Sequence, residues 1–166
     1  MAVEIRRIGA GEWGDLRDLR LRALTDAPDA FTVTYEEESL EADAHWTDWA
    51  AELAEGGSSF GLVAVTEGRW IGMAVGGPHR DFPGEAGLYA MWVDPSARGA
   101  RVARALVEGV VAWAGSAGFP VIRLRVTLSK DAAVRLYVRC GFSDAGLRMP
   151  LREGSDIMTM SMTMDL

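Results

Sequence analysis

The sequence is poor in the residues that build metal centres and covalent cross-links. It contains one cysteine, Cys140, and two histidines, His45 and His79. A single cysteine excludes an internal disulfide framework and a multi-cysteine zinc site, and so few histidines leave little for a histidine-rich centre. We therefore expect no metal at the functional site.

Long apolar runs are also missing. The least charged stretch, residues 105–122, is interrupted by Glu108, Gly118 and Pro120, and the first residues lack the apolar core of a signal peptide. We therefore expect a soluble, cytoplasmic protein without a membrane partner. The length of 166 residues, with 49% hydrophobic and 25% charged residues, is typical of one globular domain and predicts a single domain over residues 1–166.

Each half of the chain is short of one sign of charge. Residues 1–97 carry 7 arginines and 18 acids, whereas residues 98–152 carry 10 basic and 3 acidic side chains. The net charge of −7 argues against a nucleic-acid partner, which needs a basic face. A basic segment in an acidic protein favours a small polyanion, and the acidic half favours a cationic second ligand. The alternative is that these charges only solvate opposite faces.

The spacing of apolar residues predicts alternating hairpins and strand–helix–strand crossovers. Strands are expected at residues 3–8, 60–66, 70–75, 87–93, 121–128, 146–151 and 157–164, and helices at 13–24, 46–53, 102–114 and 132–139. The segment 76–84, with two prolines, is expected to be a loop. This order predicts an α/β (α+β) fold with a mixed sheet and helices on its faces.

The last predicted strand has a methionine on every second residue. Met158, Met160, Met162 and Met164 alternate with threonine and serine. Methionine fills gaps in apolar cores, so we expect this stripe to face the core. If the strand lies at the edge of the sheet, it offers a surface for a second copy of the chain, as a homodimer.

The stretch of residues 92–106 has the features of a phosphate site. A predicted strand ends there, a short turn follows, and a helix begins. The first backbone N–H groups of a helix have no internal partner and attract anions. Small residues and arginines are interleaved at this helix start: Arg98, Gly99, Ala100, Arg101, Ala103 and Arg104. The alternative is an arginine-rich, solvated helix start.

These residues resemble the acetyl-CoA motif of the GNAT N-acetyltransferase superfamily, Arg/Gln-x-x-Gly-x-Gly/Ala. Arg98 matches its first position and Ala103 its last. The later run Ala133-x-x-Leu136-Tyr137-x-x-x-Gly141-Phe142 resembles the family motif A-x-x-L-Y-x-x-x-G-F. The resemblance implies a single GNAT-like domain with a mixed, mostly antiparallel sheet of about seven strands and about four flanking helices.

The chain departs from the family pattern at two positions. Arg101 replaces the central glycine, and Lys130 replaces an asparagine that many members have seven residues before the tyrosine. Arg101 either clamps the pyrophosphate or fills the groove, because an arginine does not permit the close backbone approach that glycine permits. Lys130 adds a positive charge that reaches the cofactor. These departures leave open a non-catalytic module of the same fold that binds acyl-CoA.

The resemblance also implies a reaction and a set of roles. It implies direct transfer of acetyl from acetyl-CoA to a primary amine of a small molecule or peptide. The backbone N–H of Val93, or of its neighbour Trp92, would stabilise the oxyanion, and Tyr137 would protonate the thiolate. The implied cofactor-binding residues are Met91, Trp92, Val93, Arg98, Gly99, Ala100, Arg101, Val102, Ala103, Arg104, Lys130, Ala133 and Tyr137.

The resemblance further implies that the segments 31–40 and 78–84 build the acceptor side. Three consecutive acids, residues 36–38, favour a cationic amine, although ordinary solvated charge explains them as well. The candidate substrate-binding residues are Phe31, Tyr35, Glu38, His79 and Tyr89. No residue stands out as the base that removes a proton from the amine, and a water relay is an equal alternative.

Overall fold

The structure is a computed structural model that describes residues 2–99 and 101–166. Within them the chain forms seven β-strands and five α-helices. The strands are β1 (Glu4–Arg7), β2 (Phe60–Thr66), β3 (Arg69–Pro78), β4 (Ala86–Val93), β5 (Val121–Thr127), β6 (Ser143–Pro150) and β7 (Met158–Asp165). The helices are α1 (Trp13–Asp26), α2 (Tyr35–Glu38), α3 (Asp43–Glu55), α4 (Val102–Ser116) and α5 (Asp131–Arg139). Two 3-10 turns, η1 (Pro28–Ala30) and η2 (Pro95–Ala97), complete the order.

The predicted order of elements is confirmed, with two differences. The short helix α2 was not predicted, although Thr34 and Glu37 form a capping box in which the Glu37 N–H donates to Thr34 Oγ1 at 3.2 Å. The predicted loop at 76–84 begins later, because β3 continues to Pro78. Gly76 explains this extension: a Cβ there would lie 2.8 Å from Trp113 of α4, so glycine lets the helix pack directly on the strand.

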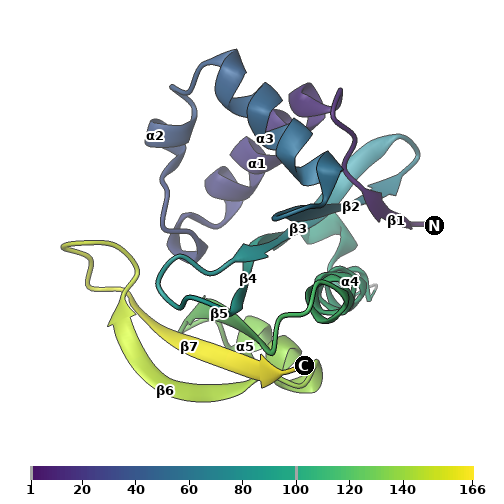
Figure 1. Cartoon of the computed structure of the whole chain (residues 1–166). Helices are drawn as coiled ribbons and strands as arrows, with labels where there is room; N and C mark the ends of the chain where they lie inside the picture. The colour runs from purple at the N-terminus through teal and green to yellow at the C-terminus, as the bar shows by residue number, and fades with distance from the viewer. Residues whose placement is uncertain (1, 100) are drawn as a thin grey trace.

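The seven strands form one sheet in the order β1-β2-β3-β4-β5-β7-β6. The β4–β5 pair is parallel and the other neighbours are antiparallel, which confirms the predicted mixed, mostly antiparallel sheet. Helices α1, α2 and α3 lie on one side of the sheet, and α4 and α5 on the other (Figure 1). No helix within residues 2–99 and 101–166 is long and apolar enough to cross a lipid bilayer.

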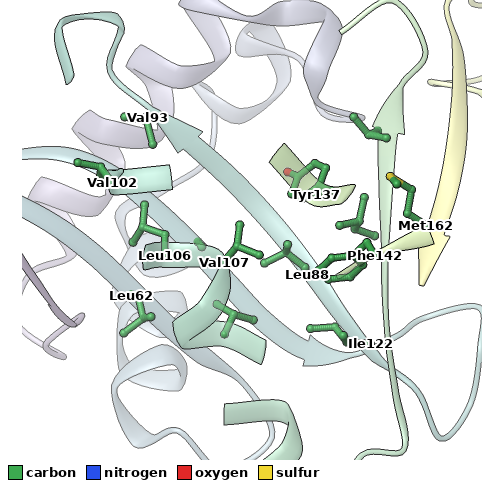
Figure 2. Close-up of a cluster of buried hydrophobic side chains, with 14 of the residues drawn as sticks. Leu62, Leu88, Val93, Val102, Leu106, Val107, Ile122, Tyr137, Phe142 and Met162 are labelled. Carbon is green, nitrogen blue, oxygen red and sulfur yellow. The ribbon is translucent and has the colours of Figure 1, made fainter. Parts of the chain in front are cut away.

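The sheet opens between β4 and β5. These strands share only the pairs Ala86↔Ile122 and Gly87↔Arg123, although β4 continues to Val93 and β5 to Thr127. Figure 2 shows Val93 and Ile122 on strands that run apart, with Tyr137 between them. The second half of β4 therefore has a backbone edge that is not hydrogen-bonded to β5.

Two apolar cores cover the two faces of the sheet. Alternation along β2 assigns the residues: Val63 packs in the core under α1 and α3, whereas Leu62 and Ala64 pack in the core under α4. Tyr137 and Phe142 extend the second core toward β5 and β7 (Figure 2). The burial of both faces fixes β4 and its open edge in place.

Strand β7 meets the sequence expectations only in part. Met160 and Met162 are buried as predicted, but Met158 is 39% exposed, because it pairs with Pro150 at the end of the hairpin. β7 lies between β5 and β6, so the condition for edge pairing through this strand is not met. The edge strand on this side of the sheet is β6, and a bulge between Asp144 and Arg148 interrupts its pairing with β7.

Candidate active site

The open edge of β4 presents the peptide groups of Val93. The Asp94 N–H donates to Ile71 O at 2.7 Å, so Asp94 is hydrogen-bonded to β3. Hydrogen bonding alternates along an antiparallel strand, and the preceding residue therefore directs its N–H and C=O to the opposite side, toward β5. Accordingly, Val93 O accepts from Arg98 Nε at 3.0 Å and not from β3. This alternation distinguishes Val93 from Trp92, whose peptide groups face β3.

A β-bulge lies just before this edge. The register of β3 and β4 shifts between Met73 and Val75, and Ala90 has a φ of 51°. A bulge adds a residue to one strand and re-aims the backbone that follows it. Bulges of this kind turn the end of β4 away from a regular ladder and toward the gap.

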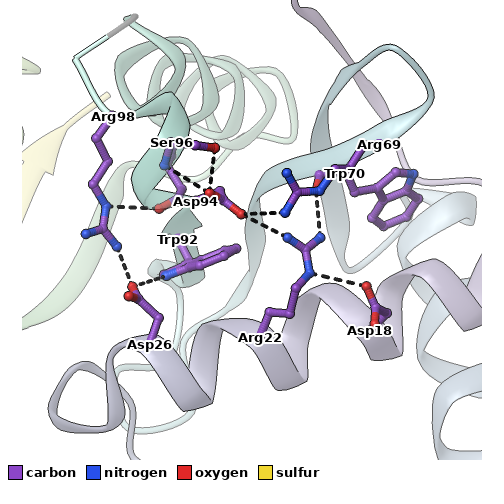
Figure 3. Close-up of polar contacts among 10 residues, drawn as sticks. Asp18, Arg22, Asp26, Arg69, Trp70, Trp92, Asp94, Ser96 and Arg98 are labelled. Atoms are coloured by element: carbon purple, nitrogen blue, oxygen red, sulfur yellow. Dashed lines mark hydrogen bonds and ion pairs between the residues drawn. The ribbon is translucent and has the colours of Figure 1, made fainter.

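The carboxylate of Asp26, at the end of α1, holds the β4 end from one side. It accepts from Trp92 Nε1 at 3.0 Å and from Arg98 Nη2 at 2.5 Å (Figure 3). The hydrogen bond from Trp92, followed by the pairing with Arg98, lowers the pKa of the Asp26 carboxyl. Arg98 thus spans from Val93 O to Asp26, and it ties the end of the strand to α1.

A second carboxylate, Asp94, anchors the turn that follows. It accepts from Ser96 N at 2.9 Å, from Arg22 Nη1 at 3.0 Å and from Arg69 Nη2 at 3.2 Å (Figure 3). The hydrogen bonds from Ser96, with desolvation opposing them, lower the pKa of the Asp94 carboxyl. The turn between β4 and α4 is therefore fixed at its first residue.

The turn enters α4 through two residues with positive φ, Gly99 at 84° and Arg101 at 64°. Within the described residues Arg101 caps the helix without a side-chain hydrogen bond, and the first turn of α4 carries no acid. The first N–H groups of this 15-residue helix have no acceptor inside the helix. The helix end is open to an anion, which fits the diphosphate expected there. Ala100, the other predicted contact, lies outside the described residues.

The remaining predicted cofactor residues divide into core and surface. Val102 is buried, and Met91, Ala103 and Ala133 are half-buried against the core under α4 and α5. Arg104 is exposed and donates to Glu108 Oε1 at 2.6 Å.

Lys130 has a different neighbour from the one expected. Its Nζ lies 3.0 Å from Asp29 Oδ1 in η1, and Thr127 Oγ1 donates to Asp29 O at 2.6 Å. In this structure Lys130 therefore ties the end of β5 to η1, and its charge is paired with a carboxylate.

Tyr137 lies in the gap between β4 and β5. It is 8% exposed and packs edge-on against Phe142, with ring centroids 6.0 Å apart. Burial raises the pKa of the Tyr137 hydroxyl far above its usual value. The phenol is therefore protonated at neutral pH. Its hydroxyl points away from Phe142, toward β4 (Figure 2).

A cavity of about 870 Å³ opens onto this gap. Its lining includes Tyr137 and Met91, together with the predicted acceptor residues Phe31, His79 and Tyr89. The cavity thus connects Tyr137 to the segments expected to hold the acceptor.

Two predicted acceptor residues lie elsewhere. Tyr35 is 42% exposed and is absent from the lining of both described cavities. Glu38 is buried, lines a neighbouring cavity of about 420 Å³ and accepts from Arg20 Nε at 3.0 Å. Its charge is therefore neutralised within the protein, and the expectation that this carboxylate attracts a cationic amine is not supported.

His79 has a defined protonation state. Burial lowers the pKa of its imidazole, so the ring is neutral at pH 7. Its Nδ1 accepts from Asp81 N at 3.1 Å, which places the remaining proton on Nε2. His79 therefore offers the cavity a hydrogen-bond donor and not a free base at Nε2.

Several arginines and a tryptophan of the cavity wall were not predicted from the sequence. Arg20, Trp49, Arg125 and Arg152 line the cavity. Arg125 carried a signal, because it interrupts the apolar run Val121–Thr127 on a strand that the sequence marks as buried. A charge on such a strand must meet a partner or a cavity.

Comparison with known proteins agrees with this geometry. Residues 16–142 match the Acetyltransferase (GNAT) family. The chain belongs to this family. A mycothiol acetyltransferase of Sanguibacter keddieii is 31% identical over 117 residues, which are 66% of this chain and 37% of that protein. The chain thus spans little more than a third of the length of that curated relative.

Solved structures share the whole fold of this GNAT chain. A GNAT-family acetyltransferase from Streptococcus pneumoniae superposes with a TM-score of 0.84 at 18% identity, over 99% of this chain and 100% of that one. yncA from Salmonella typhimurium, solved with its cofactor acetyl-CoA, gives 0.82 at 19% identity, over 100% and 95%. A GCN5-related N-acetyltransferase from Kribbella flavida gives 0.77 at 25% identity, over 99% and 98%.

Proposed function

We propose that this GNAT protein transfers the acetyl group of acetyl-CoA directly to a primary amine of a small molecule or peptide. The observation that carries the proposal is the gap between β4 and β5. The open backbone edge at Val93, the N-terminus of α4 and the buried hydroxyl of Tyr137 border this gap, and the 870 Å³ cavity opens onto it. A ternary complex needs such a place, where two substrates enter from different sides and meet.

The turn before α4 supports binding of the diphosphate of acetyl-CoA. Backbone N–H groups and the helix dipole attract a phosphate without any particular side chain. Arg101 is exposed at this end and adds a positive charge. Acetyl-CoA supplies a thioester, whose carbonyl carbon forms a bond to the amine nitrogen while its bond to sulfur breaks.

Two groups of the chain assist that exchange. The N–H of Val93 would donate to the carbonyl oxygen as negative charge develops on it, and one such donor contributes about 2.7–4 kcal/mol to lowering the barrier. Tyr137 would give its proton to the leaving thiolate, because its hydroxyl is protonated at neutral pH and lies in the gap where the thioester would sit. The amine transfers its proton to a base, for which no residue is assigned.

The second candidate is an acyl-CoA-binding module without transfer, which the replacement of the family glycine by Arg101 favours. Calorimetric titration with acetyl-CoA, followed by a broad amine panel with free-thiol detection and mass spectrometry, separates the two. An acetylated product with stoichiometric thiol release supports the enzyme. Tight binding with no product from any amine supports the module, and no binding contradicts both.

A further inference from the structure

Arginines dominate the charged wall of the 870 Å³ cavity. Its lining contains four of them, Arg20, Arg80, Arg125 and Arg152, and three acids, Glu52, Asp81 and Glu153. The acids are all on exposed or half-exposed loops and helix surfaces, whereas Arg20 is 7% exposed. Arg20 is paired with the buried Glu38, whereas Arg125 and Arg152 have no ion pair within the described part of the chain and make their side of the cavity positive, although the chain as a whole is acidic.

Two arginines on the same face of β5, Arg123 and Arg125, differ in whether they have a carboxylate partner. The guanidinium of Arg123 donates to both carboxylate oxygens of Glu85, at 2.6 and 3.1 Å, and to Ser161 Oγ at 3.0 Å. Arg125, two residues further, has no ion pair among the described residues. Its guanidinium donates to Leu151 O at 2.9 Å and to the sulfur of Met149 at 3.2 Å. Its Nε is buried and finds no acceptor within the described part of the chain.

Two more guanidinium groups border the same stretch of wall. Arg152 Nη2 donates to Phe31 O at 2.7 Å, and the guanidinium of Arg20 lies 4.9 Å from the centre of the Phe31 ring. Arg20 uses Nε for Glu38, which leaves its two terminal nitrogens for other partners. Arg20, Arg125 and Arg152 thus border a wall made of Phe31 and Leu151. Arg20 is paired with Glu38, whereas Arg125 is held only by the Leu151 carbonyl and a weak thioether contact and has no carboxylate partner among the described residues.

We propose that the acceptor amine carries an acidic group, a carboxylate in the simplest case, which Arg125 binds with Arg20 and Arg152 beside it. This inference rests on the proposed function and names the acceptor class of that site. A carboxylate matches the planar fork of arginine and supplies the anion that Arg125 lacks. The amine end of the same molecule would then extend toward Tyr89 and the β4 edge.

The first experiment uses matched acceptors. Amino acids are compared with their amides and with the amines that lack the carboxyl carbon, in the free-thiol assay at saturating acetyl-CoA. We expect kcat/KM to be about 10- to 100-fold higher for the carboxylates, the worth of one charge-assisted contact. Equal or higher values for the amides and the plain amines would overturn the inference.

The second experiment removes the arginine. Arg125→Gln should abolish the preference for the carboxylate, chiefly through KM, and Arg125→Lys should keep only part of it, because lysine lacks the fork. Arg148→Gln is the control: Arg148 lies on β6, is exposed and pairs with Asp144 at 2.7 Å. A folded Arg125→Gln variant, with an unchanged melting temperature, that keeps the full preference would refute the assignment.

The third experiment separates this inference from the proposed function. Binding of N-acetylated amino acids to the CoA-saturated protein is measured by calorimetry, which requires no transfer. Binding that falls at least 10-fold in Arg125→Gln supports the carboxylate site even if no amine is acetylated, in which case only the proposed function fails. Acetylation of plain amines with no binding of the carboxylates overturns the inference and leaves the proposed function intact.

Discussion

The two halves of the sheet are built differently. Strands β1 to β4 form a continuous antiparallel ladder with a core on each face, whereas β6 at the end of the other half is exposed along most of its length. The halves share two residue pairs. Each half supplies a different part of the site: β4 gives a backbone edge, and the segment after β5 gives Tyr137. The site therefore depends on how the halves are held together and apart.

The two ends of the gap are held by different contacts. At the closed end, Glu85 before β4 pairs with Arg123 of β5. At the open end, the last residue of α1 and the turn η1 that follows it reach both strands: Asp26 pairs with Arg98 next to β4, and Asp29 pairs with Lys130 after β5. The closed end is a partly buried ion pair whose arginine is buried, and the open end consists of more exposed pairs. We therefore expect the first to stabilise the fold and the second to position the site.

The largest effect is expected from Tyr137, which lies between the two halves of the sheet. Tyr137→Phe should lower kcat by about 10²–10⁴-fold, because the leaving thiolate loses its proton donor. The dissociation constant for acetyl-CoA, measured by calorimetry, should stay nearly the same. Tyr35→Phe, at an exposed tyrosine outside both cavities, is the matched control. Unchanged turnover of Tyr137→Phe across the pH range would remove the assigned role.

The closed end should dominate stability. Glu85→Ala leaves the Arg123 guanidinium, which is 8% exposed and stacked on Phe82 at 3.7 Å, without its carboxylate. The free energy of unfolding should fall by about 3–5 kcal/mol in denaturant titrations. Glu108→Ala removes an equally short but exposed ion pair with Arg104, and it should change the free energy of unfolding far less, because solvent screens the pair. Similar losses for both variants would contradict the distinction between the two ends.

The pH dependence of the Glu85→Ala effect gives an independent check. The hydrogen bond from Arg123 lowers the pKa of the Glu85 carboxyl below its value in the unfolded chain. A lowered pKa contributes stability above the unfolded-state pKa of about 4.3, and this contribution is lost as pH falls through the folded-state pKa. The stability difference between the wild type and Glu85→Ala should therefore shrink below about pH 4. A stability difference that grows as the pH falls would mean that folding raises the pKa of the Glu85 carboxyl instead of lowering it.

The open end should affect turnover more than folding. Asp26→Ala leaves Trp92 Nε1 and Arg98 without their shared acceptor, and it should cost about 1–2 kcal/mol of stability because two hydrogen bonds to a carboxylate are lost. Since Arg98 also holds Val93 O, we expect kcat to fall while KM for acetyl-CoA changes little. Asp18→Ala, which removes a more exposed ion pair with Arg22 on the same helix, is the control. Equal kinetics for the two variants would mean that Asp26 does not position β4.

Much of the fold could be predicted from the sequence because its strands and helices have clear periods and clear ends. The helix that starts at Trp13 ends before Pro28, and α3 ends at Gly56, which adopts a φ of 65°. The α4 turn and Tyr137 could be placed for a different reason, namely that both lie in motifs whose spacing is local. These parts of the site depend on residues close in the chain.

The acceptor cavity could not be predicted because it is assembled from distant segments. Arg20, Arg125 and Arg152 come from α1, β5 and the β6–β7 loop, and no local pattern brings them together. The run of acids at residues 36–38 indicated a cationic ligand, but the buried pairing of Glu38 with Arg20 is a contact across 18 residues. Charge composition predicts a ligand only where the charges remain unpaired after folding.

The smallest effect concerns the turn that joins the first half to α4. Arg101 has a φ of 64°, a conformation that costs a non-glycine residue about 1 kcal/mol. Arg101→Gly should raise the free energy of unfolding by up to this amount, reduced by the greater freedom of glycine in the unfolded chain. The same variant should bind acetyl-CoA several-fold more weakly, because the exposed guanidinium at the helix end is lost. Tighter binding of acetyl-CoA would show instead that the arginine obstructs the groove. Calorimetry measures the binding. The control is Arg104→Gly, because Arg104 is paired with Glu108.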